Sequence, residues 1–131
     1  MKTVNNELFK VDKLEHTDNI IKADVSINQN CSIFKGHFPG QPVVPGACML
    51  QLVKEVLEDA LGQSLQIQKA GNLKFIAMVD PVKTVSVQLE ISYKFINGTV
   101  SITGKLSDRG RVCFKCSAIV TAIAGVVTGN R

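Results

Sequence analysis

Aromatic residues are scarce in this chain of 131 residues, making up 5% of it, with no Trp and a single Tyr. Hydrophobic residues account for 45% and charged residues for 20%, a balance that excludes a disordered or fibrous protein. Aliphatic side chains must therefore fill the core, and the length suits one domain. We expect a single domain over residues 1–131, with its core at about 8–123.

The chain also lacks a strong charge bias and a long apolar run. Its net charge is +4, and the 15 Lys and Arg residues are scattered, which excludes a nucleic-acid-binding tail. The first residues contain no apolar signal region, and the longest apolar stretch, 118–127, is interrupted by Thr121 and too short to span a bilayer. We expect a cytoplasmic protein with no membrane insertion, no nucleic-acid partner and a basic surface or an acidic protein partner.

The cysteines are few and do not form a convincing disulfide or metal framework. Cys113 and Cys116 form a C-x-x-C pair, but no second pair and no nearby His completes a zinc site. They lie in a strand-like run, where residues three apart point to opposite faces. We predict no metal site and interpret all four as buried or half-buried free thiols, Cys31, Cys48, Cys113 and Cys116.

One long helix is predicted between strands. Residues 18–28 alternate, with Ile21, Ala23, Val25 and Ile27 on one face, which indicates a strand. Residues 47–62 carry apolar side chains at helical spacing, with Pro45 at the first turn and Gly62 at the end. The apolar positions of this helix are Met49, Leu52, Val53, Val56, Leu57 and Ala60.

A meander of strands follows the helix. Residues 82–93 alternate, and Asn97-Gly98 is typical of a two-residue hairpin. Further strands are predicted at 99–106 and 111–123, joined by a turn at 107–110. The pattern predicts an α+β domain in which a sheet must cover the helix, but it does not give the strand order.

The residues from Gly36 to Gly46, GHFPGQPVVPG, form the most informative segment. Its three prolines fix backbone angles and push the preceding residues toward extended geometry, so His37 is held at a set position. The segment runs into the helix start, where unpaired N–H groups at Gly46 and Ala47 suit a carbonyl oxygen that gains negative charge. An imidazole beside such donors is a layout for removing the proton alpha to a thioester carbonyl.

This segment, followed by a helix, resembles the 3-hydroxyacyl-ACP dehydratases. The similarity continues through residues 71–85, GNLKFIAMVDPVKTV, and along the meander, so it covers about residues 8–123. It implies an α+β hotdog fold, with an antiparallel sheet wrapped around one central helix. It also implies a homodimer or higher oligomer with active sites between protomers, acting on substrates carried by an acyl carrier protein in fatty-acid or related lipid biosynthesis.

The resemblance assigns roles to this chain's own residues. His37 would be the base at C2, and the Gly46 N–H would hold the thioester carbonyl. No cofactor is expected beyond the phosphopantetheine, of the carrier protein or of CoA, that carries the substrate. The residues expected to contact substrate are Phe38, Pro39, Gly40, Pro45, Gly46 and Ala47.

The chain departs from the family at Gln51, fourteen residues after His37, where the family has Glu or Asp. An amide hydrogen-bonds but cannot act as a general acid. Glu55, one helical turn on, is a substitute acid if the helix is shifted, although we expect it to be solvated or ion-paired. Alternatively, His37 performs both proton transfers while Gln51, which we expect to face the site, orients water. The remaining alternatives are an acyl thioesterase and a non-catalytic acyl-ACP-binding subunit that partners an active dehydratase.

Three weaker predictions concern other residues. His16 is expected in an exposed polar loop. A basic rim for the carrier protein or its phosphate would use Lys35, Lys69, Lys74, Arg109 and Arg111. An acyl tunnel, or alternatively plain core, would use Phe38, Met49, Leu50, Phe75 and Met78.

Overall fold

The computed structural model describes residues 7–36 and 42–123. Two helices and six strands make up this part of the chain. In order they are β1 (Phe9–Thr17), β2 (Ile20–Ile27), α1 (Ile33–Gly36), α2 (Gly46–Leu61), β3 (Leu65–Phe75), β4 (Ser86–Ile96), β5 (Thr99–Asp108) and β6 (Arg111–Ala122).

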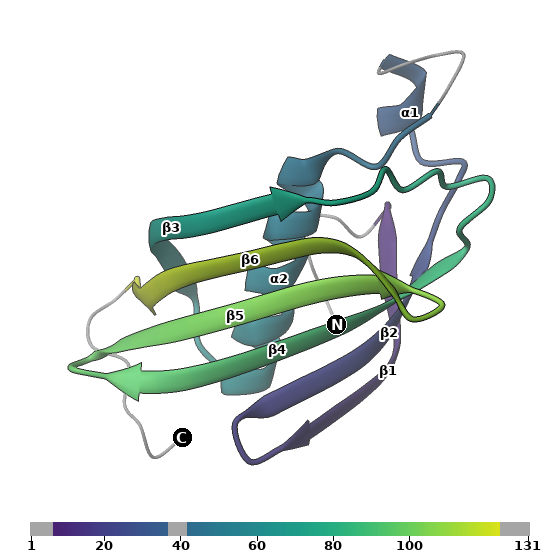
Figure 1. The fold of residues 1–131 in the computed structure, drawn as a ribbon. Helices are drawn as coiled ribbons and strands as arrows, with labels where there is room; N and C mark the ends of the chain where they lie inside the picture. Colours follow the sequence, from purple (N-terminus) through teal and green to yellow (C-terminus); the bar gives the residue numbers. More distant parts are fainter. Residues whose placement is uncertain (1–6, 37–41, 124–131) are drawn as a thin grey trace.

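The six strands form one antiparallel sheet that curves around α2 (Figure 1). The strand order is β1-β2-β4-β5-β6-β3, so the strand that follows α2 returns to the far edge of the sheet. A long helix enclosed by a single antiparallel sheet is the hotdog arrangement, and the expected fold is confirmed. The strand order itself depends on tertiary structure, because α1 and α2 connect β2 to β3, which pairs with β6 at the far edge of the sheet.

The core lies between α2 and the concave face of the sheet. Gly104 on β5 permits the close approach, because a Cβ at this position would lie 3.1 Å from a methyl group of Val53 and 3.2 Å from the sulfur of Cys116. The predicted apolar positions of α2 are buried except for Ala60, which is half-buried. The largest fully buried side chains include Phe114, Ile21, Leu52, Leu57, Leu65, Leu89, Ile91, Ile102 and Leu106.

Both predicted hairpins are present, and both turn through left-handed backbone. Asn97 and Gly98 have φ angles of 49° and 79°, which is the geometry of a type I′ turn. Arg109 and Gly110 repeat it with φ angles of 52° and 83°. The second turn is therefore two residues long rather than four, and the strand before it extends to Asp108.

Two strand predictions need correction. β1 was not predicted, because its residues are polar and mostly exposed; His16 lies in this strand rather than in a loop, although it is exposed as expected. β4 begins at Ser86 rather than Val82, because a turn closed by a hydrogen bond from the Thr84 N–H to the Asp80 carbonyl precedes it. Val82 and Val85 are consequently 59% and 64% exposed.

Cys113 and Cys116 do not point to opposite faces of the sheet, because a bulge intervenes. Phe114 pairs with Leu106 and Val112 pairs with Ser107, so Cys113 is the extra residue. Both cysteines are buried and free, which confirms free thiols, and burial raises the pKa of Cys116. Residues 7–36 and 42–123 contain no group of side chains suited to a metal ion.

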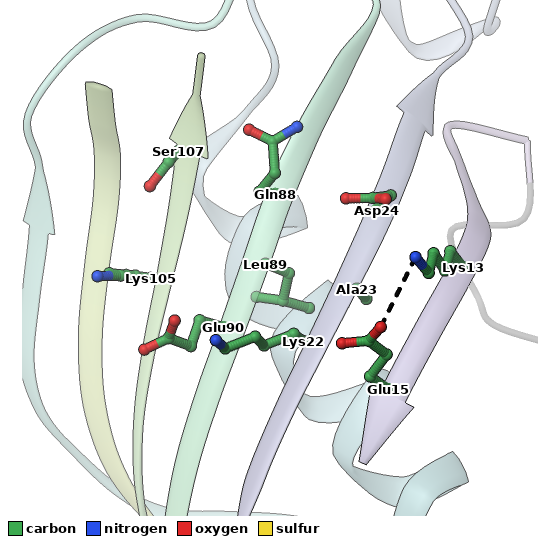
Figure 2. Close-up of a pocket in the computed structure, with 10 residues that line it drawn as sticks. All are labelled: Lys13, Glu15, Lys22, Ala23, Asp24, Gln88, Leu89, Glu90, Lys105 and Ser107. Atoms are coloured by element: carbon green, nitrogen blue, oxygen red, sulfur yellow. Dashed lines mark ion pairs between the residues drawn. The ribbon is translucent and has the colours of Figure 1, made fainter. Parts of the chain in front are cut away.

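The convex face of the sheet, opposite α2, carries charged side chains (Figure 2). Lys22, Asp24 and Glu90 lie on this face, whereas Ala23 and Leu89 between them are buried. A shallow pocket of about 240 Å³ lies among these charges, away from the helix start. None of the described helices has both the length and the apolar character needed to cross a membrane.

Candidate functional site

The start of α2 is open in the way that the sequence predicted. Pro45 is the N-cap in extended geometry, and no side chain caps the helix. The N–H groups of Cys48 and Met49 share the Pro45 carbonyl, at 3.1 and 3.3 Å. No described residue accepts from the N–H of Gly46 or Ala47, and the first turn contains no acidic residue. These two N–H groups, at the positive end of the helix, suit an acyl oxygen that gains negative charge.

Phe75, at the end of β3, covers this helix start. A Cβ at position 46 would fall inside the van der Waals surface of the Phe75 ring, 2.7 Å from its Cζ. The ring also lies beside Phe114, with centroids 5.2 Å apart, and Phe75 remains 57% exposed. Position 46 therefore requires glycine because of a close contact with β3, a reason that the sequence did not reveal.

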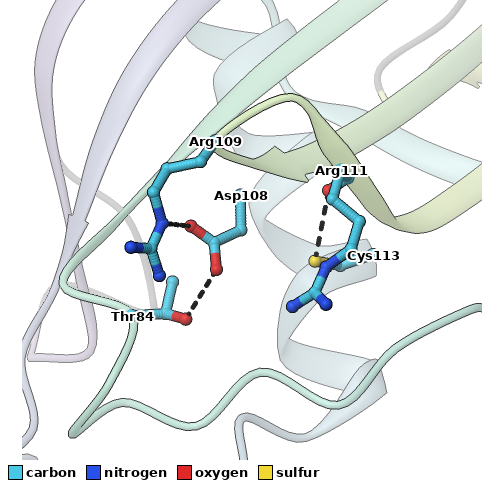
Figure 3. A network of polar contacts seen from close by, with 5 residues as sticks. All are labelled: Thr84, Asp108, Arg109, Arg111 and Cys113. Carbon is cyan, nitrogen blue, oxygen red and sulfur yellow. Dashed lines mark hydrogen bonds and ion pairs between the residues drawn. The ribbon is translucent and has the colours of Figure 1, made fainter.

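The chain just before the helix is held by the segment between β3 and β4. The N–H of Val44, a buried residue, donates to the carbonyl of Val79 at 2.9 Å. That segment is fixed in turn at Thr84, whose hydroxyl donates to Asp108 at 2.9 Å (Figure 3). Arg109 donates to the same carboxylate at 3.2 Å, and the Thr84 hydrogen bond, followed by Arg109, lowers the pKa of Asp108. The β5–β6 hairpin thus supports the end of the motif through two hydrogen-bonded contacts.

Gln51 and Glu55 form a pair one helical turn apart on α2. The Gln51 amide nitrogen donates to a carboxylate oxygen of Glu55 at 2.8 Å. Gln51 is half-buried, whereas Glu55 is only 6% exposed. The expectation of a solvated Glu55 was wrong, because this side chain is buried and accepts a hydrogen bond from Gln51. A nearby ion pair joins Lys54 to Glu58, at 3.5 Å.

The open strip of α2 carries Ala47, Gln51, Lys54 and Glu58, which are exposed or half-buried. Ala47 and Gln51 are four residues apart, so they lie on one side of the helix. The structure therefore places Gln51 on the same side of the helix as Ala47, one turn after the helix start.

The other predicted residues are spread over several parts of the chain. His37, Phe38, Pro39 and Gly40 lie outside the described residues. Met49 is buried in the core and Leu50 is half-buried, whereas Met78 is 72% exposed. The predicted basic residues come from several elements: Lys35 belongs to α1, Lys69 and Lys74 lie on β3, and Arg109 and Arg111 lie at the β5–β6 hairpin.

His16 is a structural contact and not a second base at the helix start. Its Nε2 lies 2.6 Å from the hydroxyl of Tyr93, a contact that joins β1 to β4 across the intervening β2. Burial raises the pKa of Tyr93. This pairing was not predictable from the sequence, because the two residues are 77 positions apart.

Comparison with known proteins agrees with this geometry. The family model described as ApeI-like, ApeI dehydratase, matches residues 13–113. The chain belongs to the ApeI-like dehydratase family. The match includes the motif, all of α2 and the open helix start, so the expected dehydratase relationship is confirmed.

Individual relatives share only a low sequence identity with this ApeI-like chain. It is 28% identical to a 3-hydroxyacyl-[acyl-carrier-protein] dehydratase FabZ of Rhizorhabdus wittichii, over 71% of this chain and 65% of the relative. It is 27% identical to a FabZ of Lactiplantibacillus plantarum, over 88% and 81%. The chain thus spans just under two thirds of the first relative's length.

Among solved structures, the dehydratase heterocomplex ApeI:P from Xenorhabdus doucetiae resembles this fold with a TM-score of 0.70. The identity is 16%, and the match covers 92% of this chain and 99% of that chain. At this identity the likeness supports the hotdog fold alone.

Proposed function

We propose that the chain is a cytoplasmic 3-hydroxyacyl-ACP dehydratase that removes water from a 3-hydroxyacyl thioester. The observation that carries the proposal is the uncapped start of α2, directly after the segment that contains His37. Family membership and the FabZ relatives support the same reaction. The reaction consists of proton transfers and the loss of one C–O bond, so it calls for no cofactor.

In the proposed mechanism the N–H of Gly46 holds the thioester carbonyl and stabilises the charge that forms on its oxygen. His37 removes the proton from C2, the C–H electron pair becomes the C2–C3 double bond, and the C3–O bond breaks. Gln51 cannot supply the proton that the leaving hydroxide needs. The imidazolium formed in the first step returns it, so that His37 serves as base and then as acid.

The contact between Gln51 and Glu55 determines which hydrogen-bonding groups of the Gln51 amide remain for a substrate. One N–H of Gln51 is engaged by the Glu55 carboxylate, which leaves the amide oxygen and the second N–H for another partner. We propose that these groups hold the 3-hydroxyl of the substrate in the orientation that elimination requires. Glu55 is then a positioning residue that fixes the amide.

We also propose a homodimer that pairs through β3, with Gln51 of one protomer completing the site of the other. β3 is an edge strand that pairs only with β6 among the described strands. Leu73 and Phe75 on this strand are 38% and 57% exposed. An open edge with exposed apolar side chains favours pairing with a second copy. The acyl carrier protein named in the relatives' activity is the proposed substrate carrier.

A direct assay tests the activity. Purified protein is incubated with a 3-hydroxyacyl-ACP, and the loss of water is followed by mass spectrometry. We expect turnover that falls by about a hundred- to ten-thousand-fold in His37→Ala, because that variant loses the only proton carrier. Release of a free thiol would indicate a thioesterase instead. Absence of turnover in the wild type would favour the binding subunit.

A swap variant tests the role of the Gln51–Glu55 pair. Gln51→Glu with Glu55→Gln keeps one amide and one carboxylate in contact, but moves the carboxyl group to the position that the family uses. We expect this double variant to be faster than the wild type, because it regains a general acid. Gln51→Glu alone is the matched control: its two carboxyl groups would share a proton, which changes the pH profile. A swap variant that is slower than the wild type would contradict the assigned roles.

A further inference from the structure

The connecting segment, residues 76–85 between β3 and β4, contains no helix or strand. Few of its side chains are buried, namely Val79, Pro81 and Thr84. Its other large apolar side chains are 55–72% exposed, namely Ile76, Met78, Val82 and Val85. Burial of side chains therefore contributes little to holding this segment, and its position depends mainly on hydrogen bonds.

Backbone hydrogen bonds attach both ends of the connecting segment to neighbouring strands. At its start, the N–H groups of Ile76 and Ala77 donate to the Cys113 carbonyl on β6, at 2.8 and 3.2 Å. At its other end, the Val85 carbonyl accepts from the N–H of Ile27, the last residue of β2, at 2.8 Å. The sheet thus fixes the two ends, and further contacts must fix the middle.

One of these further contacts joins the middle of the segment to the motif of residues 36–46. The Val44 N–H donates to the Val79 carbonyl at 2.9 Å, and both side chains are buried. Pro42 and Pro45 have no N–H, so the motif has few backbone donors just before α2, and Val44 uses one of them here. A shift of Val79 would therefore be passed to the chain that leads from His37 into α2.

The other contact fixes the turn that follows Val79. The Thr84 N–H donates at 2.8 Å to the carbonyl of Asp80, the residue next to Val79. The Thr84 hydroxyl donates to one carboxylate oxygen of Asp108 at 2.9 Å, and Arg109 donates to the other at 3.2 Å (Figure 3). Thr84 and Asp108 are each only 7% exposed. A buried carboxylate that accepts on both oxygens restrains orientation as well as distance, which apolar packing alone does not.

We propose that Asp108 is a positioning residue for the reaction at the start of α2. Asp108 holds Thr84, the turn that Thr84 closes holds Val79, and Val79 holds the motif. The inference rests on the proposed function, since the motif supplies both the base and the N–H that binds the thioester carbonyl. These groups must be aligned with C2 of the substrate, and a displacement of about 1 Å can cost roughly a hundredfold in rate.

Three single variants test the contact between Asp108 and Thr84. Asp108→Asn replaces one acceptor oxygen by an NH2 group, so one of the two donors loses its acceptor. Thr84→Val removes the hydroxyl, whereas the conservative Thr84→Ser keeps it. We expect kcat for a 3-hydroxyacyl thioester to fall about tenfold in the first two variants, with little change in KM. Thr84→Ser should keep a kcat near that of the wild type.

A double variant and a stability control separate positioning from general destabilisation. Asp108→Asn/Thr84→Val should be no slower than either single variant, because both substitutions remove the same contact. The control is Glu58→Ala, which removes the acceptor of the Leu65 N–H beyond the far end of α2. All kinetics are measured where circular dichroism shows each variant to be folded. Unchanged kcat in Asp108→Asn, an equal loss in Glu58→Ala, a slow Thr84→Ser or additive losses in the double variant would each overturn the proposal.

Amide hydrogen exchange at Val44, followed by NMR, tests the same inference without any turnover. We expect the Val44 N–H to exchange about tenfold faster in Asp108→Asn than in the wild type, under native conditions where exchange occurs by local opening. The rate should be unchanged in Thr84→Ser and in Glu58→Ala. Equal exchange in Asp108→Asn and wild type would overturn the proposal. If the wild type dehydrates no substrate, the proposed function fails, and this measurement alone decides whether Asp108 positions the motif.

Discussion

The two ends of α2 are completed in different ways. At its C-terminal end, Gly62 adopts a left-handed φ of 69° and donates its N–H to the Glu58 carbonyl at 2.8 Å. The Glu58 carboxylate accepts from the Leu65 N–H at 2.6 Å and pairs with Lys54. At its N-terminal end, Pro45 provides no side-chain cap, and no acidic residue faces the helix dipole.

The difference separates what stabilises the fold from what serves the site. The C-terminal end satisfies its polar groups within the chain, which contributes to stability. The N-terminal end leaves donors unmatched within the described chain, and an uncapped helix start is a stability cost that a bound acyl oxygen would offset. Substitutions at the start should therefore affect activity most, and substitutions at the end should affect stability most.

Gly46→Ala should have the largest effect, and on activity. The new methyl group and the Phe75 ring cannot occupy the same space, so the ring must swing outward and the helix start loses its cover. We expect kcat/KM to fall about a hundredfold through displacement of the anchoring N–H, and stability to fall by only about 1 kcal/mol, because the exposed ring can move. Steady-state kinetics and thermal unfolding measure the two effects. Adding Phe75→Leu should recover part of the activity, and an unchanged kcat/KM in Gly46→Ala would contradict the assignment.

Glu58→Ala should act in the opposite sense. The Leu65 N–H, on a fully buried residue, loses its acceptor, and Lys54 loses its ion pair. We expect a loss of about 2 kcal/mol in the free energy of unfolding, with kcat/KM unchanged below the unfolding temperature. Denaturant titration measures the loss, and Asp59→Ala, an exposed neighbour, is the control. A variant with normal stability and reduced activity would break the distinction between the two ends.

Asp108→Asn should cause a smaller loss of stability that depends on pH. The folded-state pKa of Asp108 is lowered, chiefly by the Thr84 hydroxyl, so its contribution is present above the unfolded pKa and is lost as pH falls through the folded value. The variant should be less stable than wild type at neutral pH, and the difference should shrink below about pH 4 and vanish once the pH is below the folded-state pKa. Unfolding curves across this range measure it. A difference that persists at low pH would mean that the carboxylate charge is not responsible.

Gly62→Ala should have the smallest effect. No atom lies within 4 Å of the added methyl group, so the cost is the left-handed backbone alone, about 1 kcal/mol. Gly62→Asn should cost less, because Asn tolerates this conformation better than Ala. Thermal unfolding compares the two. Neither should change kcat/KM, and any loss of activity would show that the two helix ends are coupled.

Features set by neighbouring residues were predictable from the sequence. Local periodicity and backbone preference determine the helix from Gly46, the left-handed turn at Asn97-Gly98 and the alternating strand before that turn. The open helix start was also predictable, because Pro45 cannot cap and the first turn contains no acid. The dehydratase family followed from the motif for the same reason: its information lies within a few consecutive residues.

Features set by distant contacts were not predictable. Glu55 was expected to be solvated or ion-paired, and its burial was not predictable, because the helix pattern does not show what covers that side of α2. The bulge at Cys113 and the hydrogen bond between His16 and Tyr93 both depend on strand register.

The sequence by itself determined the helix α2, the uncapped start of that helix and the tight turns between strands, because each depends on the chemistry of adjacent residues. Only the tertiary structure decided that Phe75 covers Gly46 and that the Glu55 carboxylate holding Gln51 is buried, because contacts between distant parts of the chain produce both.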